Sequence, residues 1–119
     1  MIDYKTHQVS DSTIVVEVSG NLDESTRSYF FKCIEDLLDA GTQYIIIECH
    51  RLGHLNSASL ASLLSARKKA TKNGGRIYLT HLSSSLVEVF EITKLGRLLS
   101  VYPTTELALE HIGVDPNFA

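Results

Sequence analysis

Hydrophobic and polar residues alternate with a period of two at the start of the chain. The run TIVVEVSG at 13–20 alternates around β-branched residues and ends at a glycine, which predicts a strand. The more polar IDYKTHQV at 2–9 predicts an earlier strand, and Ser10, Asp11 and Ser12 predict a turn between the two. We therefore expect these two strands to pair as an antiparallel hairpin.

The period then changes to that of a helix. Within LDESTRSYFFKCIEDLLDAG at 22–41, apolar residues recur at helical spacing at Phe30, Ile34, Leu37 and Leu38. Asp23 or Ser25 is expected to cap the start of this helix. Gly41 is expected to end it.

The rest of the chain alternates between strands and helices. YIIIECH at 44–50 has almost no polar alternation, which is typical of a parallel strand covered on both faces. The spacing of Leu60, Leu63, Leu64 and Arg67 predicts a second helix that ends near 73–75. The further predicted elements are a strand at 76–82, a helix at 84–96 ended by Gly96, a strand at 98–103, and a helix at 104–113 capped by Thr104 or Thr105.

This order predicts an α/β fold with a mixed, mostly parallel sheet of about five strands and about four helices. We expect one domain over residues 1–119, with its core at about 4–112 and a loose tail at 113–119. Ligands and partners of such sheets usually meet the carboxyl ends of the strands.

Composition narrows the classes of function. The chain has 119 residues, 44% hydrophobic and 21% charged, and a net charge of −3, which suits an ordinary globular domain. The basic cluster at 67–69 lacks interleaved aromatic residues, so no nucleic-acid partner is expected. No apolar stretch reaches the length of a membrane span and the start does not resemble a signal peptide, so we expect a cytoplasmic protein without membrane insertion. Cys33 and Cys49 are expected to be buried free thiols, as in a reducing compartment.

The stretch LNSASLASLL at 55–64 carries the candidate site, because its hydroxyl groups lie where a strand gives way to a helix. A hydroxyl at a helix start can accept a hydrogen bond from a free backbone N–H, which contributes about 1 kcal/mol. It can also point outward, toward a partner or a kinase. Asn56 or Ser57 as a simple helix cap therefore stays open beside the functional interpretation.

Three segments resemble the STAS domain family, whose best known soluble members are the bacterial anti-sigma factor antagonists. VSGNLDEST at 18–26 resembles the Gly-x-Leu-Asp signature before the first helix. IIIECHRLGHLNSASLASLL at 45–64 resembles the hallmark in which Asp-Ser-Ser-Gly-Leu opens the second helix. GGRIYLTHLSSSLVEVFEITKLGRLLSVYPTTELAL at 74–109 resembles the second half of the family's domain.

The resemblance implies roles residue by residue. Asn56 takes the aspartate's place and Ser57 that of the phosphorylatable serine; Ala58, Ser59 and Leu60 take the places of the second serine, the glycine and the leucine. Asn56 and Ser59 depart from the pattern, since one lacks a carboxylate and the other lacks the backbone freedom of glycine. The expected partner-binding residues are Asp23, Asn56, Ser57, Ala58, Ser59, Ala61, Ser62 and Ser65.

The implied function is that of a regulatory binding module and not of an enzyme, with no cofactor. Its partner would be an anti-sigma factor serine kinase, and phosphorylation of Ser57 would weaken the complex and so regulate transcription. The alternative is an unphosphorylated STAS subunit of a lipid-transport ATPase complex or of a signalling scaffold. The sequence leaves self-association and nucleotide binding open.

Two weaker alternatives come from the histidines. Cys49, His50, His54 and His81 gather at predicted strand ends, where imidazoles can bind a transition metal, although their spacing matches no compact ligand pair. A hydrolase built from Ser57, His81 and Asp23 lacks the G-x-S-x-G elbow. We therefore expect neither a metal site nor catalytic residues.

Overall fold

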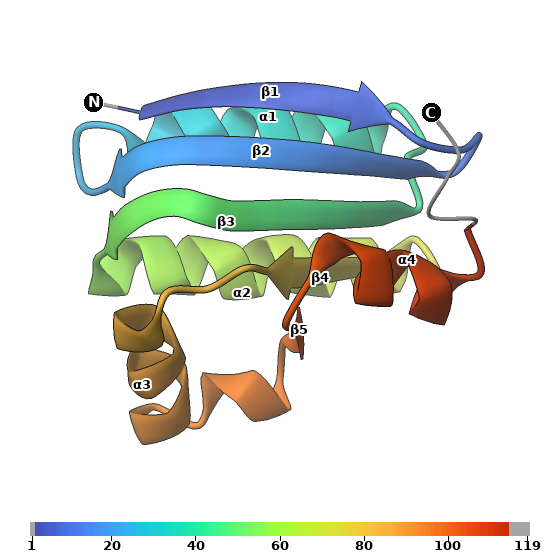
Figure 1. Ribbon diagram of the computed structural model, residues 1–119. Helices are drawn as coiled ribbons and strands as arrows, with labels where there is room; N and C mark the ends of the chain where they lie inside the picture. The colour runs from blue at the N-terminus through green and yellow to red at the C-terminus, as the bar shows by residue number, and fades with distance from the viewer. Residues whose placement is uncertain (1, 115–119) are drawn as a thin grey trace.

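A computed structural model describes residues 2–114 and contains a five-stranded sheet in the order β1-β2-β3-β4-β5 (Figure 1). β1 pairs antiparallel with β2, and every later neighbour pairs parallel, so the predicted hairpin and mixed sheet are confirmed. The strands are β1 (Ile2–Gln8), β2 (Thr13–Leu22), β3 (Tyr44–Leu55), β4 (Arg76–Thr80) and β5 (Ser100–Tyr102). β4 is slightly shorter than predicted.

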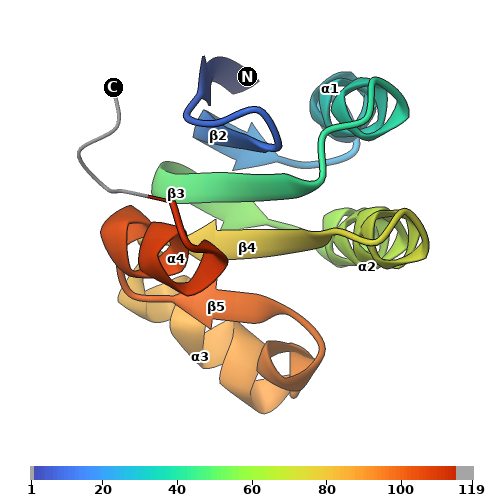
Figure 2. The ribbon, with the colours of Figure 1, turned by 90° about the vertical axis from the view of Figure 1, so that its right-hand side faces the viewer.

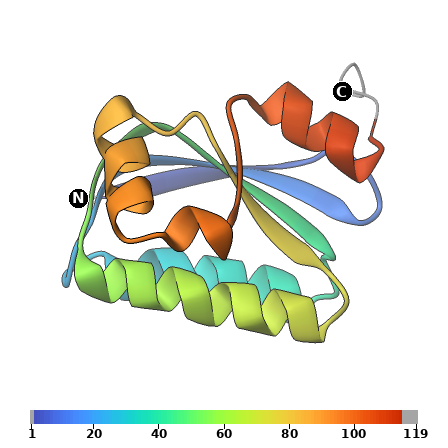
Figure 3. The same cartoon turned by 90° about the horizontal axis from the view of Figure 1, so that it is seen from below.

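Helices cover the two faces of the sheet unequally (Figures 2 and 3). They are α1 (Arg27–Asp39), α2 (Ser57–Lys72), α3 (Ser84–Ile92) and α4 (Thr105–Ile112). α1, α2 and α3 supply residues to the larger apolar core, among them the fully buried Phe30 and Ile34. α4 packs on the opposite face, where Ala108 and Leu109 join a smaller cluster.

α1 begins five residues later than the predicted segment. Its N-cap is Thr26, which makes no side-chain capping bond, so the prediction that Asp23 or Ser25 caps the helix is wrong. The Asp23 carboxylate instead accepts hydrogen bonds from the backbone N–H groups of Ser25 and Thr26, at 2.9 and 3.2 Å. These bonds close a turn before the helix, a use of aspartate that competes with capping.

β3 runs to Leu55, five residues beyond the predicted end at 50. Two irregularities in its pairing with β2 shift the register, and Cys49, Leu52 and Leu55 all stay in the larger core. A β-bulge adds one residue to a strand without ending its pairing. The apolar residues at every third position therefore remain buried in a segment whose pattern does not look like a strand.

The carboxyl-terminal part differs from prediction at the end of α3. α3 ends at Ile92, and Gly96 lies in a separate 3-10 turn, η1 (Leu95–Arg97), that follows Lys94 in a left-handed conformation. At the end of α4, Gly113 is the C-cap and the Val114 N–H donates to the Leu109 carbonyl at 2.9 Å. Residues 113 and 114 of the predicted loose tail make these contacts with α4, and the remainder, 115–119, lies outside the described residues.

Candidate functional site

The start of α2 is held by Asn56 and not by a serine. The Asn56 side-chain oxygen accepts a hydrogen bond from the Ser59 N–H at 2.8 Å, and its own N–H donates to the Leu22 carbonyl at 3.1 Å. An amide oxygen caps a helix as well as a carboxylate does. The departure of Asn56 from the family pattern therefore leaves this structural role intact.

Ser57 is the first residue of α2 and is exposed to solvent. Because Asn56 already supplies the capping oxygen, the helix start does not need the Ser57 hydroxyl. The two alternatives raised by the sequence thus divide between neighbouring residues: Asn56 caps the helix, and Ser57 presents a neutral hydroxyl to solvent.

Ser59 is buried, which corrects its place among the predicted contact residues. It has no exposed surface, and its hydroxyl donates to the Leu22 carbonyl at 3.1 Å. Leu22 ends β2, so this bond ties the second strand to the second helix. Ser59 is therefore a residue of the fold and not of the surface, and its hydroxyl has a use that a glycine would not supply.

Asp23 lies in the turn that follows β2, directly after Leu22. The hydrogen bond from the Ser25 hydroxyl, at 2.7 Å, lowers the pKa of the Asp23 carboxyl below its ordinary value, and backbone hydrogen bonds act in the same direction. Leu22 and Leu55 pair in the sheet, so this turn begins beside the strand that leads into α2. The turn therefore places an ionised carboxylate at the same sheet edge as Ser57.

The small residues of α2 named above differ in their exposure, and two of them, Ser62 and Ser65, lie beside α1. Ala61 and Ser65 are exposed and Ala58 and Ser62 are half-buried. A groove of about 290 Å³ runs between the two helices, and Ser62 and Ser65 form part of its α2 side. The predicted partner-binding residues, except Ser59, therefore keep surface that another protein can reach.

Arg27 is a site residue that the sequence did not indicate. Its guanidinium Nη1 donates to the Ser62 hydroxyl at 3.2 Å, and Nη2 donates to the Glu24 carboxylate at 3.2 Å. Arg27 and Ser62 are 35 positions apart, so only the packing of α1 on α2 brings them together. No local motif marks such a contact.

Cys49 and His81, which belong to the alternative sites, have structural contacts of their own. Cys49 is buried, and burial raises the pKa of its thiol to about 12. His81 Nε2 accepts a hydrogen bond from the Thr105 N–H at 3.3 Å, so this nitrogen is used at the start of α4. Within residues 2–114, no group of three or more His, Cys, Asp or Glu side chains is placed to hold a metal ion.

The arrangement defines a class of protein: a small α/β domain with a hydroxyl exposed at a helix entrance on the carboxyl edge of its sheet. The family model described as STAS domain matches residues 4–108, and this chain belongs to the STAS domain family. The resemblance inferred from the sequence is thus confirmed. No helix within residues 2–114 is both long enough and apolar enough to cross a membrane.

Individual proteins are similar to this chain in sequence or in structure. An anti-sigma-B factor antagonist of Staphylococcus aureus (strain NCTC 8325 / PS 47) is 26% identical over 97 residues, which cover 82% of this chain and 90% of the relative. An anti-sigma factor antagonist from Mycobacterium paratuberculosis has a similar structure, with a TM-score of 0.84, 22% identity and 95% of both chains covered. The phosphorylated form of the Bacillus cell fate determinant SpoIIAA gives a TM-score of 0.71 at 22% identity, with 92% of this chain and 99% of that chain covered. The two structures show the shared fold.

Proposed function

We propose that this protein is an anti-sigma factor antagonist that binds a serine kinase anti-sigma factor through Ser57, the turn at Asp23 and the exposed small residues of α2. Phosphorylation of Ser57 by that kinase weakens the complex. The protein acts as a regulatory binding module in the cytoplasm and not as an enzyme. The observation that carries the proposal is the exposed Ser57 hydroxyl beside a helix cap that does not depend on it.

The geometry supports a switch that leaves the fold unchanged. A phosphate on Ser57 adds about −1.5 to −2 charges at the first residue of α2, where the helix dipole favours an anion. The Asn56 cap and the buried Ser59 bond are separate from the modified oxygen. Folding stability should therefore change little.

The same charge lowers the free energy gained when a partner protein covers Ser57. A partner that packs over Ser57 must bury an anion without a matching cation, at a cost of roughly 3 kcal/mol or more. Because each 1.4 kcal/mol is tenfold in affinity, a cost of about 3 kcal/mol weakens binding on the order of 100-fold. The exposed part of α2 around Ser57 consists of small side chains, which let a partner's backbone approach closely.

The names of the similar proteins support the choice of partner. The Staphylococcus aureus relative is called an anti-sigma-B factor antagonist, and the Bacillus protein is described in a phosphorylated form. We carry both properties to this chain as part of the proposal. Ser57 is the residue that the family resemblance assigns to phosphorylation.

The test uses candidate serine kinase anti-sigma factors from the source organism, each purified and assayed separately. Incubation with the kinase and ATP should add one phosphate, located at Ser57 by mass spectrometry of peptides. In calorimetric titrations, Ser57→Asp should weaken binding on the order of 100-fold relative to Ser57→Ala, with nearly equal melting temperatures.

Ser84 offers a matched control. It is the exposed first residue of α3, and Ser83 caps that helix as Asn56 caps α2. Ser84→Asp therefore adds the same charge in the same local setting and should leave binding unchanged. Equal affinity of Ser57→Asp and Ser57→Ala for the kinase would sink the proposal and would favour an unphosphorylated STAS subunit of a larger complex.

A further inference from the structure

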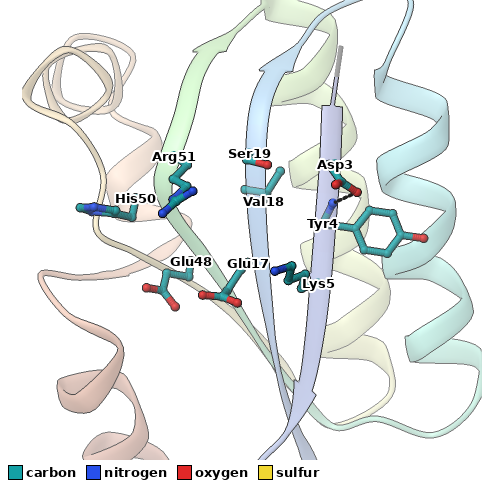
Figure 4. A pocket seen from close by; sticks show the side chains of 9 residues that line it. All are labelled: Asp3, Tyr4, Lys5, Glu17, Val18, Ser19, Glu48, His50 and Arg51. Atoms are coloured by element: carbon teal, nitrogen blue, oxygen red, sulfur yellow. Dashed lines mark hydrogen bonds between the residues drawn. The ribbon is translucent and has the colours of Figure 1, made fainter.

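Within residues 2–114, α4 covers only part of the sheet face on which it lies. α4 packs over Val15, Ile46 and Tyr78, toward the amino ends of the parallel strands. Beyond them the face forms a hollow of about 280 Å³ (Figure 4). Its polar lining comes from Asp3 and Lys5 on β1, Glu17 and Ser19 on β2, and Glu48, His50 and Arg51 on β3. This surface is separate from the face that α1 and α2 cover.

A β-bulge turns two successive basic residues toward this hollow. Glu17 pairs with Glu48 and Ser19 with Arg51, so β3 advances three residues while β2 advances two. In a regular strand successive side chains point to opposite faces. The extra residue instead lets both His50 and Arg51 line the hollow, and bulges often occur next to functional sites for this reason.

Glu48 has no hydrogen-bond donor for its carboxylate within the described chain. Only 24% of its side chain is exposed, and its one ionic neighbour is His81 Nε2 at 3.9 Å. That nitrogen accepts the Thr105 N–H at 3.3 Å, and at 3.9 Å it is too far from the Glu48 oxygen for a hydrogen bond. A half-buried carboxylate without a donor from the protein depends on solvent for its hydrogen bonds, and a ligand that supplies an N–H group can take the place of that solvent.

A second carboxylate lies beside it. Glu17 is the direct cross-strand neighbour of Glu48, and like charges in such a position repel. Glu17 has a partner, because its carboxylate contacts His7 Nε2 at 2.6 Å. Glu48 is therefore the carboxylate that still lacks a positively charged partner.

The positive groups of the hollow also lack partners. Across residues 2–114, neither Lys5 nor Arg51 forms an ion pair. Arg51 lies three positions after Glu48 on the same strand, but across the bulge these positions run opposite two residue steps of β2, which is about 7 Å at about 3.3 Å per residue. The long side chains of Lys5 and Arg51 both line the hollow (Figure 4).

We propose that this hollow binds a small zwitterion, with its ammonium group against Glu48 and its oxyanion on Arg51. A simple cation would lie beside Arg51 and Lys5, and a simple anion beside Glu17 and Glu48, so each meets repulsion. A molecule that carries both charges satisfies both unpaired groups. The volume suits a ligand the size of an amino acid, at the small end of ligand sites.

The test uses two zwitterionic probes, O-phosphoethanolamine and β-alanine, titrated into the full chain and followed by amide NMR shifts. We expect saturable shifts at Lys5, Ser19, Glu48 and Arg51 with at least one of them. Ethylamine and inorganic phosphate, which carry the charges singly, should each bind at least tenfold more weakly.

Charge-neutral variants identify the groups involved. Glu48→Gln and Arg51→Gln should each weaken probe binding at least tenfold, whereas Glu88→Gln and Arg97→Gln, at exposed positions outside the hollow, should not. Arg51 is exposed, so its variant should fold even if the Glu48 variant does not. The proposal fails if neither zwitterion gives saturable shifts, if phosphate alone binds as tightly, or if Arg51→Gln binds as well as the parent chain. Kinase binding through Ser57 is measured separately, so either result leaves the proposed function standing.

Discussion

Alanine substitutions of Ser59 and Ser57 should have different effects on folding stability, because the Ser59 hydroxyl is buried in the fold and Ser57 is exposed on the surface. Both lie in the first turn of α2, so the gain in helix propensity from Ser→Ala is similar in the two variants. Ser59→Ala alone removes a buried hydrogen bond, that from its hydroxyl to the Leu22 carbonyl at 3.1 Å. A buried hydrogen bond contributes about 1 kcal/mol net.

The cost should stay near that value, because the carbonyl is not left without a partner. The Leu22 oxygen still accepts the Asn56 N–H at 3.1 Å. We therefore expect Ser59→Ala to be about 1 kcal/mol less stable than Ser57→Ala, and not the larger penalty of a wholly unsatisfied group. For a domain of this size the difference corresponds to a fall of roughly 4 °C in melting temperature.

The assay is urea unfolding of the two variants and the parent chain, followed by circular dichroism under identical conditions. The difference between the variants isolates the hydrogen bond, since the propensity term cancels. Equal midpoints and slopes for the two variants would refute the conclusion that Ser59 ties β2 to α2. A Ser57→Ala variant that loses stability by itself would show that its hydroxyl is not free.

Two further predictions follow from the titratable groups. In a Cys33→Ser variant, the remaining Cys49 thiol should react with Ellman's reagent at pH 8 only as fast as the protein unfolds, because burial raises the pKa of this thiol to about 12. Rapid reaction of the folded protein would contradict this prediction. Asp23 has a lowered pKa in the folded state, so its contribution to stability is present above the ordinary value of 3.8 and is lost as the pH falls through the lowered pKa. Asp23→Asn should therefore reduce the loss of stability in acid, measured by urea unfolding between pH 5 and pH 2; an unchanged acid dependence would count against the assignment.

Much of the architecture was predictable because its signals are local. The alternation in β2, the apolar run at 45–47 and the spacing of Phe30 and Ile34 each follow from one element's burial on one or two faces. The N-cap at Thr104 was predictable for the same reason. The position of Ser57 at a helix start likewise follows from the residues next to it in the sequence.

The errors arose where local signals compete. Asp23 has the chemistry of a cap and also that of a turn, and the structure uses the turn. Gly96 resembles a helix end, but the helix stops four residues earlier and the glycine lies in η1. Element boundaries depend on such balances more than the existence of an element does.

The sequence alone determined the order of strands and helices, the membership suggested by three motifs and the position of Ser57, since each rests on continuous segments of the chain. Tertiary structure decided the burial of Ser59, the reach of Arg27 to Ser62 and the bulge that turns His50 and Arg51 to one face. These features depend on contacts between segments far apart in the chain. A side chain's period tells which face it prefers, but only packing and strand register determine what it meets there.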